Sequence, residues 1–191
     1  MGSPMTKSLE EMSLEELWQL FPIFLVEHET EWQNWYVSEK ADLEKVLGPD
    51  LIKNIEHIGS TAIPNIWAKN IVDILIEVAS PADMVQSRKL LVANGWRVMS
   101  EEPERISLNK GYTQNGFADK VFHLHLRLMG DCDEIYFRDY LRLHPDIAQA
   151  YQKIKLSLWK EFEHDRNGYT EAKSDFIKKY TKEAGKGQID F

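Results

Sequence analysis

The chain has 191 residues, of which 43% are apolar, and its formal net charge at pH 7 is −8. This length favours one domain with an ordinary buried core, and no stretch approaches the roughly 18 uninterrupted apolar residues of a membrane span. Cys132 is the only cysteine, which excludes a disulfide framework and paired-cysteine metal or redox chemistry.

The negative charge is concentrated at the start of the chain. Residues 1–50 contain eleven Asp and Glu but three Lys and Arg, which accounts for the whole of the −8, whereas residues 51–191 contain twenty of each sign. A long, sequence-independent contact with nucleic acid needs a basic surface, so we expect no extended nucleic-acid binding. The neutral main body can still gather cations around a small phosphorylated ligand.

The first residues resemble no secretory signal. MGSPMTKSLEEM has neither the apolar core nor the cationic flank of a signal peptide, so we expect a cytoplasmic protein without membrane attachment. We interpret MGSP as a cloning remnant and expect residues 1–12 to be a flexible N-terminus. The sequence leaves the oligomeric state open.

Two helices and a strand are predicted before residue 50. Ser13 and Glu16 form a capping-box pattern ahead of a helix over 14–20. Residues 23–28 are rich in β-type side chains and predict a strand. Thr30 caps a longer helix, which should end at Gly48-Pro49.

A strand, a Gly-Ser break and a second strand follow. Residues 52–59 predict the first strand, and a short helix is expected over 62–68 after the break. Residues 70–79 (NIVDILIEVA) are nearly all apolar and β-branched, which is typical of a strand buried on both faces.

The middle of the chain alternates again. Residues 81–95 predict a helix, with Pro81 in its first turn and Gly95 just past its end. Three strands joined by turns should follow: 96–101, 105–113 and 121–129.

From residue 133 onward the pattern is helical. We expect one helix over 133–144, another beginning at Pro145, a break at 165–168 and a last helix over 169–184. The predicted fold class is therefore α/β (α+β), with a mixed β-sheet flanked by helices over 13–130. A C-terminal helical subdomain should cover 131–183, with a flexible tail over 184–191.

The Gly-Ser break is a candidate phosphate-binding turn. A strand that feeds a turn at a helix start exposes N–H groups without internal partners. Gly59 would let the backbone approach a phosphate, and Ser60 and Thr61 add hydroxyls. A helix N-cap with no ligand is the alternative.

Asp73 is conspicuous within the apolar strand 70–79. A buried carboxylate costs several kcal/mol unless it is paired or holds a cation, so Asp73 and Glu77, which share one strand face, are candidate metal ligands. Mg²⁺ favours carboxylates together with substrate phosphates. The alternatives are an ion pair of Asp73 with Lys69 or an arginine, and a solvated rim position for Glu77.

Two histidines on a later strand are a second candidate ligand set. In VFHLHLRL, His123, His125 and Arg127 alternate with apolar residues and so share one face. Beside Asp73, one or two imidazoles would shift the metal preference toward Zn²⁺ or Mn²⁺. A face turned to solvent is the alternative.

The helical third supplies cations and aromatic side chains. Phosphoryl transfer depends mostly on positioning and charge neutralisation. The candidates for phosphate or base contacts are Arg138, Arg142, Lys155, Arg166, Lys173, Tyr140, Tyr151 and Tyr169. Each could instead be a surface side chain that coats its helix.

Five motifs together resemble a known family. IEHIGSTAIP, AKNIVDILIEV, FHLHL, YFRDYLRLHP and YTEAKSDFI, in this order, are similar to the GrpB family, which belongs to the nucleotidyltransferase-fold superfamily, and the likeness runs from about Glu15 to about Tyr180. The resemblance implies a nucleotidyltransferase-like mixed sheet, a phosphate-binding Gly59-Ser60 turn and an acidic metal site on the next strand. It brings no established reaction.

The chain departs from the superfamily pattern at the metal site. Active nucleotidyltransferases have an Asp-x-Asp/Glu pair, but here it reads Asp73-Ile74-Leu75, and the strand of the third carboxylate offers His123 and His125. A standard two-metal site cannot be assembled from these ligands. Either the metal site is altered, or catalysis is lost and binding retained.

Our hypothesis is a protein that binds a nucleotide or another phosphorylated small molecule with Mg²⁺, Mn²⁺ or Zn²⁺ and transfers a nucleotidyl group to an unknown acceptor. Asp73 and His125 would be the catalytic residues, and the metal ligands would come from Asp73, Glu77, His123 and His125. The expected phosphate- and nucleotide-binding residues are Gly59, Ser60, Thr61, Lys69, Arg138, Tyr151, Lys155, Tyr169 and Lys173. The alternatives are a non-catalytic nucleotide-binding or regulatory module and a metal-dependent phosphohydrolase using Asp73, His123 and His125.

Overall fold

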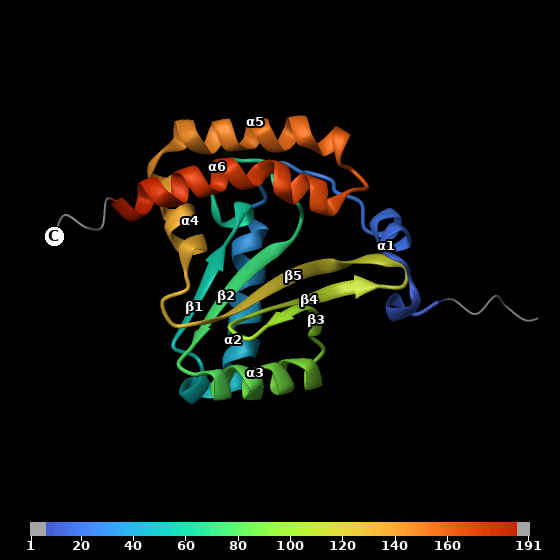
Figure 1. Cartoon of the computed structure of the whole chain (residues 1–191), viewed down its shortest axis with the longest axis vertical. Helices are drawn as coiled ribbons and strands as arrows, with labels where there is room; N and C mark the ends of the chain where they lie inside the picture. The colour runs from blue at the N-terminus through green and yellow to red at the C-terminus, as the bar shows by residue number, and fades with distance from the viewer. Residues whose placement is uncertain (1–6, 187–191) are drawn as a thin grey trace, which may run out of the picture.

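The computed structural model describes residues 7–186, which form a five-stranded mixed sheet with helices on both faces (Figure 1). The strand order is β1-β2-β5-β4-β3. Strands β2 and β5 are parallel, and the other neighbours are antiparallel. The strand bounds are β1 Asn54–Ile58, β2 Val72–Val78, β3 Arg97–Glu102, β4 Arg105–Thr113 and β5 Gly116–Leu128.

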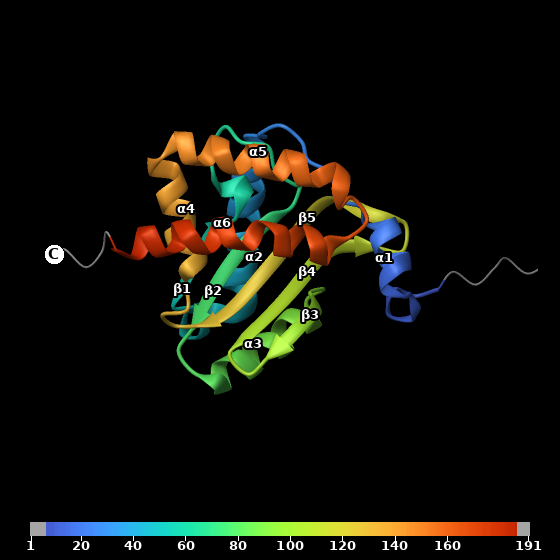
Figure 2. The same cartoon turned by 45° about the horizontal axis from the view of Figure 1, so that its top comes forward.

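The helices lie in two groups. The first group, behind and below the sheet in Figure 1, consists of α2 (Glu31–Leu51) and α3 (Pro81–Ala93). The second group consists of α4 (Asp133–Leu143), α5 (Pro145–Glu161) and α6 (Arg166–Lys186), and Figure 2 shows α6 running beside α5. The short α1 (Leu14–Leu20) lies apart, near the β4–β5 hairpin.

The two faces of the sheet differ in polarity. On the α2/α3 side, Val72, Ile74 and Ile76 are completely buried and pack with apolar residues of the other strands and of these helices. Strand alternation places Asp73, His123 and His125 on the opposite face. In the register across β4, Asn109 is the partner of His123 and Ser107 the partner of His125. We call this polar surface the site face.

A second apolar cluster fixes the C-terminal helices. Ile63 and Ile66, from the segment after β1, are buried against Phe137, Leu141 and Tyr151 of α4 and α5. Burying side chains of this size contributes about 1.5–3 kcal/mol each. This cluster holds the helical third over the site face.

Most predicted elements are confirmed. The predicted helix over 14–20 is α1, with the Ser13–Glu16 capping box formed, and the five strands and the helix over 81–95 occur close to their predicted positions. Gly48 interrupts α2 with φ 76° and ψ 166°, as the predicted break at Gly48-Pro49 requires. The mixed α/β fold with an all-helical last third is confirmed.

The predicted strand over 23–28 is wrong. This segment forms a single bridge, between Val26 and Ala68, rather than a strand. Ile23 and Leu25 are each 3% exposed, and the N–H of Ile23 donates to the carbonyl of Glu163. The segment is therefore held by the burial of its apolar side chains and by hydrogen bonds to Trp159 of α5 and to Glu163, without a β-ladder.

The predicted helix over 62–68 is also wrong. Its place is taken by one 3-10 turn, Ser60–Ala62, after which Ile63 is extended. The residue before a proline disfavours helical backbone, and Pro64 follows Ile63. Asn65 then has a positive φ of 61°.

The last helix begins earlier than predicted. Helix α6 starts at Arg166, inside the expected break at 165–168, because the N–H of Gly168 donates to Asp165 Oδ1 at 2.9 Å. The segment is thus an N-terminal cap rather than an interruption.

Some predictions concern the chain ends. Residues 1–6, including MGSP, and residues 187–191 of the expected tail lie outside the described residues, whereas Leu9–Glu11 form a short 3-10 helix.

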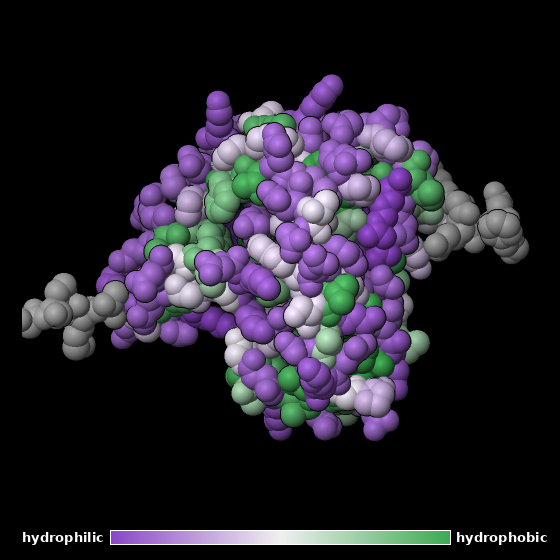
Figure 3. All heavy atoms as spheres, turned by 180° about the vertical axis from the view of Figure 1, so that it is seen from behind, coloured by the Kyte–Doolittle hydropathy of each residue, from purple (hydrophilic) through white to green (hydrophobic). Residues whose placement is uncertain are grey.

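Figure 3 shows the face behind the sheet, where hydrophobic side chains are scattered among hydrophilic ones. Within residues 7–186, no helix has the length and apolar character needed to cross a membrane.

Candidate functional site

The Gly-Ser turn is built against Asp73. Gly59 has φ 74° and ψ −173°, and a Cβ added there would lie 2.6 Å from Asp73 Oδ2. Only glycine fits this backbone conformation and this close approach. The carboxylate therefore lies directly beneath the turn.

The two hydroxyls of the turn have different surroundings. Thr61 Oγ1 lies 2.8 Å from His57 Nε2, on the side of β1 away from Asp73. Ser60 lies in the same cavity lining as Tyr151 of α5. Of the two hydroxyl groups predicted to bind phosphate, that of Ser60 is therefore the one nearer α5.

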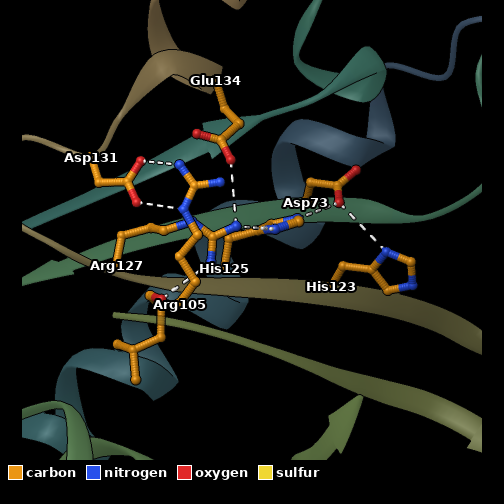
Figure 4. Close-up of polar contacts among 8 residues, drawn as sticks. Asp73, Arg105, His123, His125, Arg127, Asp131 and Glu134 are labelled. Atoms are coloured by element: carbon orange, nitrogen blue, oxygen red, sulfur yellow. Dashed lines mark hydrogen bonds and ion pairs between the residues drawn. The ribbon is translucent and has the colours of Figure 1, made fainter. Parts of the chain in front are cut away.

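Asp73 receives two histidines of β5 on the same oxygen (Figure 4). His125 Nε2 lies 2.9 Å and His123 Nδ1 3.5 Å from Asp73 Oδ1. Burial raises the pKa of Asp73, but the hydrogen bonds from His123 and His125 outweigh it and hold that pKa well below its usual range. The alternative for Asp73, an ion pair with Lys69 or an arginine, is not formed among the described residues, and the histidines take its place.

An arginine faces the other nitrogen of each histidine. Arg127 Nη2 lies 3.4 Å from His125 Nδ1, and Arg166 Nη2 lies 3.1 Å from His123 Nε2. The Asp73 carboxylate can only accept, so the nitrogen of each histidine that faces it carries a hydrogen. Burial lowers the pKa of His123 to about 4, although Asp73 acts in the opposite direction. The His123 ring is therefore neutral at pH 7. The result is an Arg–His–Asp–His–Arg row across the site face.

A group of cations without acidic partners surrounds this row. Lys69 and Lys173 lie over the ring of the fully buried Tyr169, 4.7 and 4.2 Å from its centroid. Lys155 is 2% exposed and donates to the carbonyl of Trp67. Among the described residues, none of Lys69, Lys155, Lys173 and Arg166 forms an ion pair with Asp or Glu.

Their pKa values reflect this crowding. Burial lowers the pKa of Lys69 and of Lys155 well below the ordinary value, and the charge of Lys173 lowers both further. Burial, with repulsion from Arg166, lowers the pKa of Lys173 to about 8, although Asp73 opposes it. Strongly shifted pKa values in a cleft mark a candidate functional site.

These groups line one cavity of about 950 Å³ between the site face and α5/α6. Its lining includes Gly59, Ser60, Asp73, Tyr151 and the cations just described. Seven lining side chains are Lys or Arg and three are Asp or Glu, so the cavity is locally cationic although the chain is acidic. We call this cavity the anion cleft.

Two predicted site residues lie elsewhere. Glu77 is at the far end of β2, where it accepts from Asn54 Nδ2 at 2.9 Å and from the N–H of Gly130 at 2.8 Å. Arg138, 6% exposed, connects α4 to β1 through Glu56 and the carbonyl of His57, each at 2.7 Å. The structure brings neither of them to Asp73.

The remaining donors do not fit a metal ion held by protein ligands. In the described part of the chain, no three His, Cys, Asp or Glu side chains are grouped as a metal site. The second carboxylate position is Leu75, which is fully buried, and the histidine nitrogens nearest Asp73 carry hydrogens directed at it. Of the expected ligands, the structure brings Asp73, His123 and His125 together but not Glu77, and it shows no protein-held Mg²⁺, Mn²⁺ or Zn²⁺ site within the described residues.

Arg127 and Tyr112 are parts of the site that the prediction missed. Strand alternation already placed Arg127 on the face of His123 and His125, which was a usable signal. Tyr112, whose hydroxyl lies 2.7 Å from His123 Nε2, comes from β4, and nothing in its local sequence distinguishes it.

The family profile described as GrpB protein matches residues 22–183. The UPF0157 protein YqkA of Bacillus subtilis (strain 168) is 34% identical over 171 residues, which is 86% of this chain and 49% of YqkA, so the chain spans about half the length of that relative. The crystal structure of conserved protein GrpB from Enterococcus faecalis matches with a TM-score of 0.75 and 28% identity, over 87% of this chain and 100% of its own.

A weaker likeness joins the chain to a crystal structure of the Cid1 poly(U) polymerase, with a TM-score of 0.46 and 12% identity over 75% of this chain and 43% of that one. The similarity to GrpB proteins is much stronger, because the family profile covers most of the chain. The Enterococcus protein also matches the fold of this chain over the whole of its own length. The chain belongs to the GrpB family.

Proposed function

We propose that the anion cleft binds the phosphate groups of a nucleotide or of another phosphorylated small molecule. The observation that carries this proposal is a set of four cationic side chains in one cavity, none of which has a carboxylate partner within residues 7–186: Lys69, Lys155, Lys173 and Arg166. Keeping buried cations unpaired costs free energy, and an anionic ligand would supply the missing partner.

Phosphate fits better than a single carboxylate. Lys69 and Lys173 both line the cleft, and the charge of Lys173 is near enough to lower the pKa of Lys69, so one multivalent anion would be attracted by both ammonium groups. The Gly59-Ser60 turn lies in the same cavity lining and offers backbone N–H groups from the opposite side. A cavity of about 950 Å³ is within the size of nucleotide-scale pockets.

The test is a calorimetric titration with tripolyphosphate and with ATP, in the presence of EDTA. We expect binding without added metal, and Lys69→Met should weaken it by about 10- to 100-fold, the value of a charge-assisted hydrogen bond. The matched control is Lys153→Met, an exposed lysine of α5 outside the cleft, which should leave the affinity unchanged. Equal affinities in the wild type and Lys69→Met, or binding that requires a metal ion, would contradict the proposal.

Nucleotidyl transfer is the second candidate, and the position of Asp73 favours it. Its carboxylate lies under Gly59 in the same cavity, where Oδ2 can accept a hydrogen bond from an acceptor hydroxyl. The hydroxyl oxygen would bond to the α-phosphorus, the bond to pyrophosphate would break, and the proton would pass to water. The depressed pKa of Asp73 makes it an orienting group rather than a strong base.

Asp73→Asn separates transfer from binding. It removes a negative charge from the cleft, so tripolyphosphate should bind at least as tightly, whereas pyrophosphate release from a nucleoside triphosphate should fall by about 100-fold or more. Binding without pyrophosphate release in the wild type would leave the non-catalytic module. No contact favours the metal-dependent phosphohydrolase, because the nitrogens of His123 and His125 that face Asp73 carry hydrogens.

A further inference from the structure

A second hollow, of about 810 Å³, opens beside the anion cleft. Its floor is the site face of β4 and β3, its roof is the first half of α6, and its wall is α1. Figure 1 shows α1 at that end of the sheet. We call this hollow the side groove.

The floor of the side groove presents an amide that has no protein partner among the described residues. Asn109 is only 7% exposed and lines the groove, and no hydrogen bond of its side chain is formed in that part of the chain. Its amide atoms are not sealed in the protein interior but reach the groove, where they can donate to and accept from a polar ligand. Ser107, one step along the same face, adds a hydroxyl.

The wall is apolar and faces this polar floor. Trp18 and Leu17 of α1 line it, and two apolar side chains at its rim are unusually open to solvent, Leu14 at 63% and Met99 at 42%. Polar groups on one side and an indole on the other suit a ring that carries hydroxyls, because its edge can hydrogen-bond while its face packs on the aromatic surface.

The charges around the groove argue against an anionic ligand, since Glu171 of α6 also lines it. Arg97 pairs with Glu10 at 2.8 Å, and Arg166 is directed at His123. The floor between them, at Asn109 and Ser107, is uncharged. An anion would bind in the neighbouring anion cleft in preference to the side groove, because the lysines lie in that cleft.

We propose that the side groove binds an uncharged polyhydroxylated ring, either a free sugar or the ribose of a nucleoside. The groove and the anion cleft share His123, His125 and Arg166, so a hydroxyl held on Asn109 would face Asp73 from the β4 side. Binding stands on the groove alone, whereas the role of this ligand as the acceptor of a nucleotidyl group rests on the proposed transfer function.

The experiment is saturation-transfer NMR with two mixtures, one of neutral monosaccharides and one of nucleosides, each at millimolar concentration. We expect saturation transfer to at least one compound, and the mixture in which it occurs distinguishes a sugar from a nucleoside. Asn109→Leu should weaken binding by about tenfold or more. Asn34→Leu, on the exposed face of α2, is the control and should have no effect.

A structural role for Asn109 is tested in the same samples. Because its amide has no partner in the free protein, Asn109→Leu should not lower the melting temperature, whereas loss of a structural hydrogen bond would. Trp18→Ala is the second variant and should also weaken binding. The inference is overturned if neither mixture shows saturation transfer, or if Asn109→Leu and Trp18→Ala bind as the wild type does.

The two sites can fail separately. Lys173→Met should leave binding in the side groove intact, and Asn109→Leu should leave tripolyphosphate binding intact. A ring ligand without tripolyphosphate binding would overturn the proposed function alone, and the reverse result would overturn the side groove alone.

Discussion

Lys173→Met is expected to make the protein more stable and at the same time to remove most of its affinity for phosphate. In the folded protein, burial and Arg166 lower the pKa of Lys173 to about 8, from an ordinary 10.5. At pH 7 the native state therefore holds an ammonium group that would be better solvated in the unfolded chain. Replacing it by an apolar side chain of similar length should stabilise the fold by about 2 kcal/mol, which raises the melting temperature by about 4–8 °C.

The pH dependence of the wild-type stability tests independently whether the buried Lys173 ammonium group destabilises the fold. Between about pH 8 and 10.5 the unfolded chain binds more protons at Lys173 than the native state does, so the stability of the wild type should rise with pH in this window. Lys173→Met should flatten that rise. Melting curves from pH 7 to 10.5 measure both effects, with Lys153→Met as the control. A melting temperature below that of the wild type would show that Lys173 stabilises the fold.

Phosphate binding should respond in the opposite direction. A bound polyanion holds the proton on Lys173, so wild-type affinity for tripolyphosphate should fall as the pH rises above about 8, by up to about tenfold per unit. Lys173→Met should bind about 10- to 100-fold more weakly at pH 7 and lose this dependence. A gain in stability with a loss of binding is typical of a functional site rather than of a surface charge.

Gly59→Ala is expected to have the largest effect on stability. The backbone at φ 74° and ψ −173° costs a non-glycine residue about 1–3 kcal/mol. The new Cβ would also lie 2.6 Å from Asp73 Oδ2, and such overpacking adds about 1–3 kcal/mol. Together these should lower the free energy of unfolding by about 2–6 kcal/mol, to be measured by urea denaturation.

Gly48→Ala is a matched control for the backbone contribution. Gly48 has nearly the same dihedral angles, φ 76° and ψ 166°, but a Cβ there would have no atom within 4 Å. Gly48→Ala should lower the free energy of unfolding by the backbone contribution alone. In an Asp73→Ala background, which removes the clashing carboxylate, Gly59→Ala should be destabilising by the same smaller amount. If Gly48→Ala and Gly59→Ala are equally destabilising in the wild-type background, the turn is not packed on the carboxylate as described.

Much of the site could be predicted because single elements determine it. Strand alternation alone places His123, His125 and Arg127 on one face, and an acidic residue inside an apolar strand marks Asp73. Lys69, Lys155, Lys173, Tyr151 and Tyr169 all line the anion cleft, although they come from three separate segments. Glu77 lies on the same face of β2 as Asp73 but four residues further along the strand. The predicted face was therefore correct, but the two carboxylates do not belong to one site.

The metal expectation depended on facts that no single segment contains. Whether a histidine offers a lone pair or an N–H depends on the group at its other nitrogen, and here Arg127 and Arg166 lie in those positions. Arg166 comes from α6, more than forty residues after His123 in the chain. For His123, only the packing of α6 over the site face decides this, whereas Arg127 lies on the same strand as His125.

By itself, the sequence determined the periodic elements, the two-faced sheet and the family motifs, because alternation, capping and turn chemistry act over a few neighbouring residues. The tertiary structure decided the rest: that Gly59 lies on Asp73, that three lysines meet without acidic partners, and that a second hollow meets the first at His123 and His125. These features arise where segments far apart in the chain pack together. Their energies depend on burial and on facing charges, which exist only once the helical third lies on the sheet.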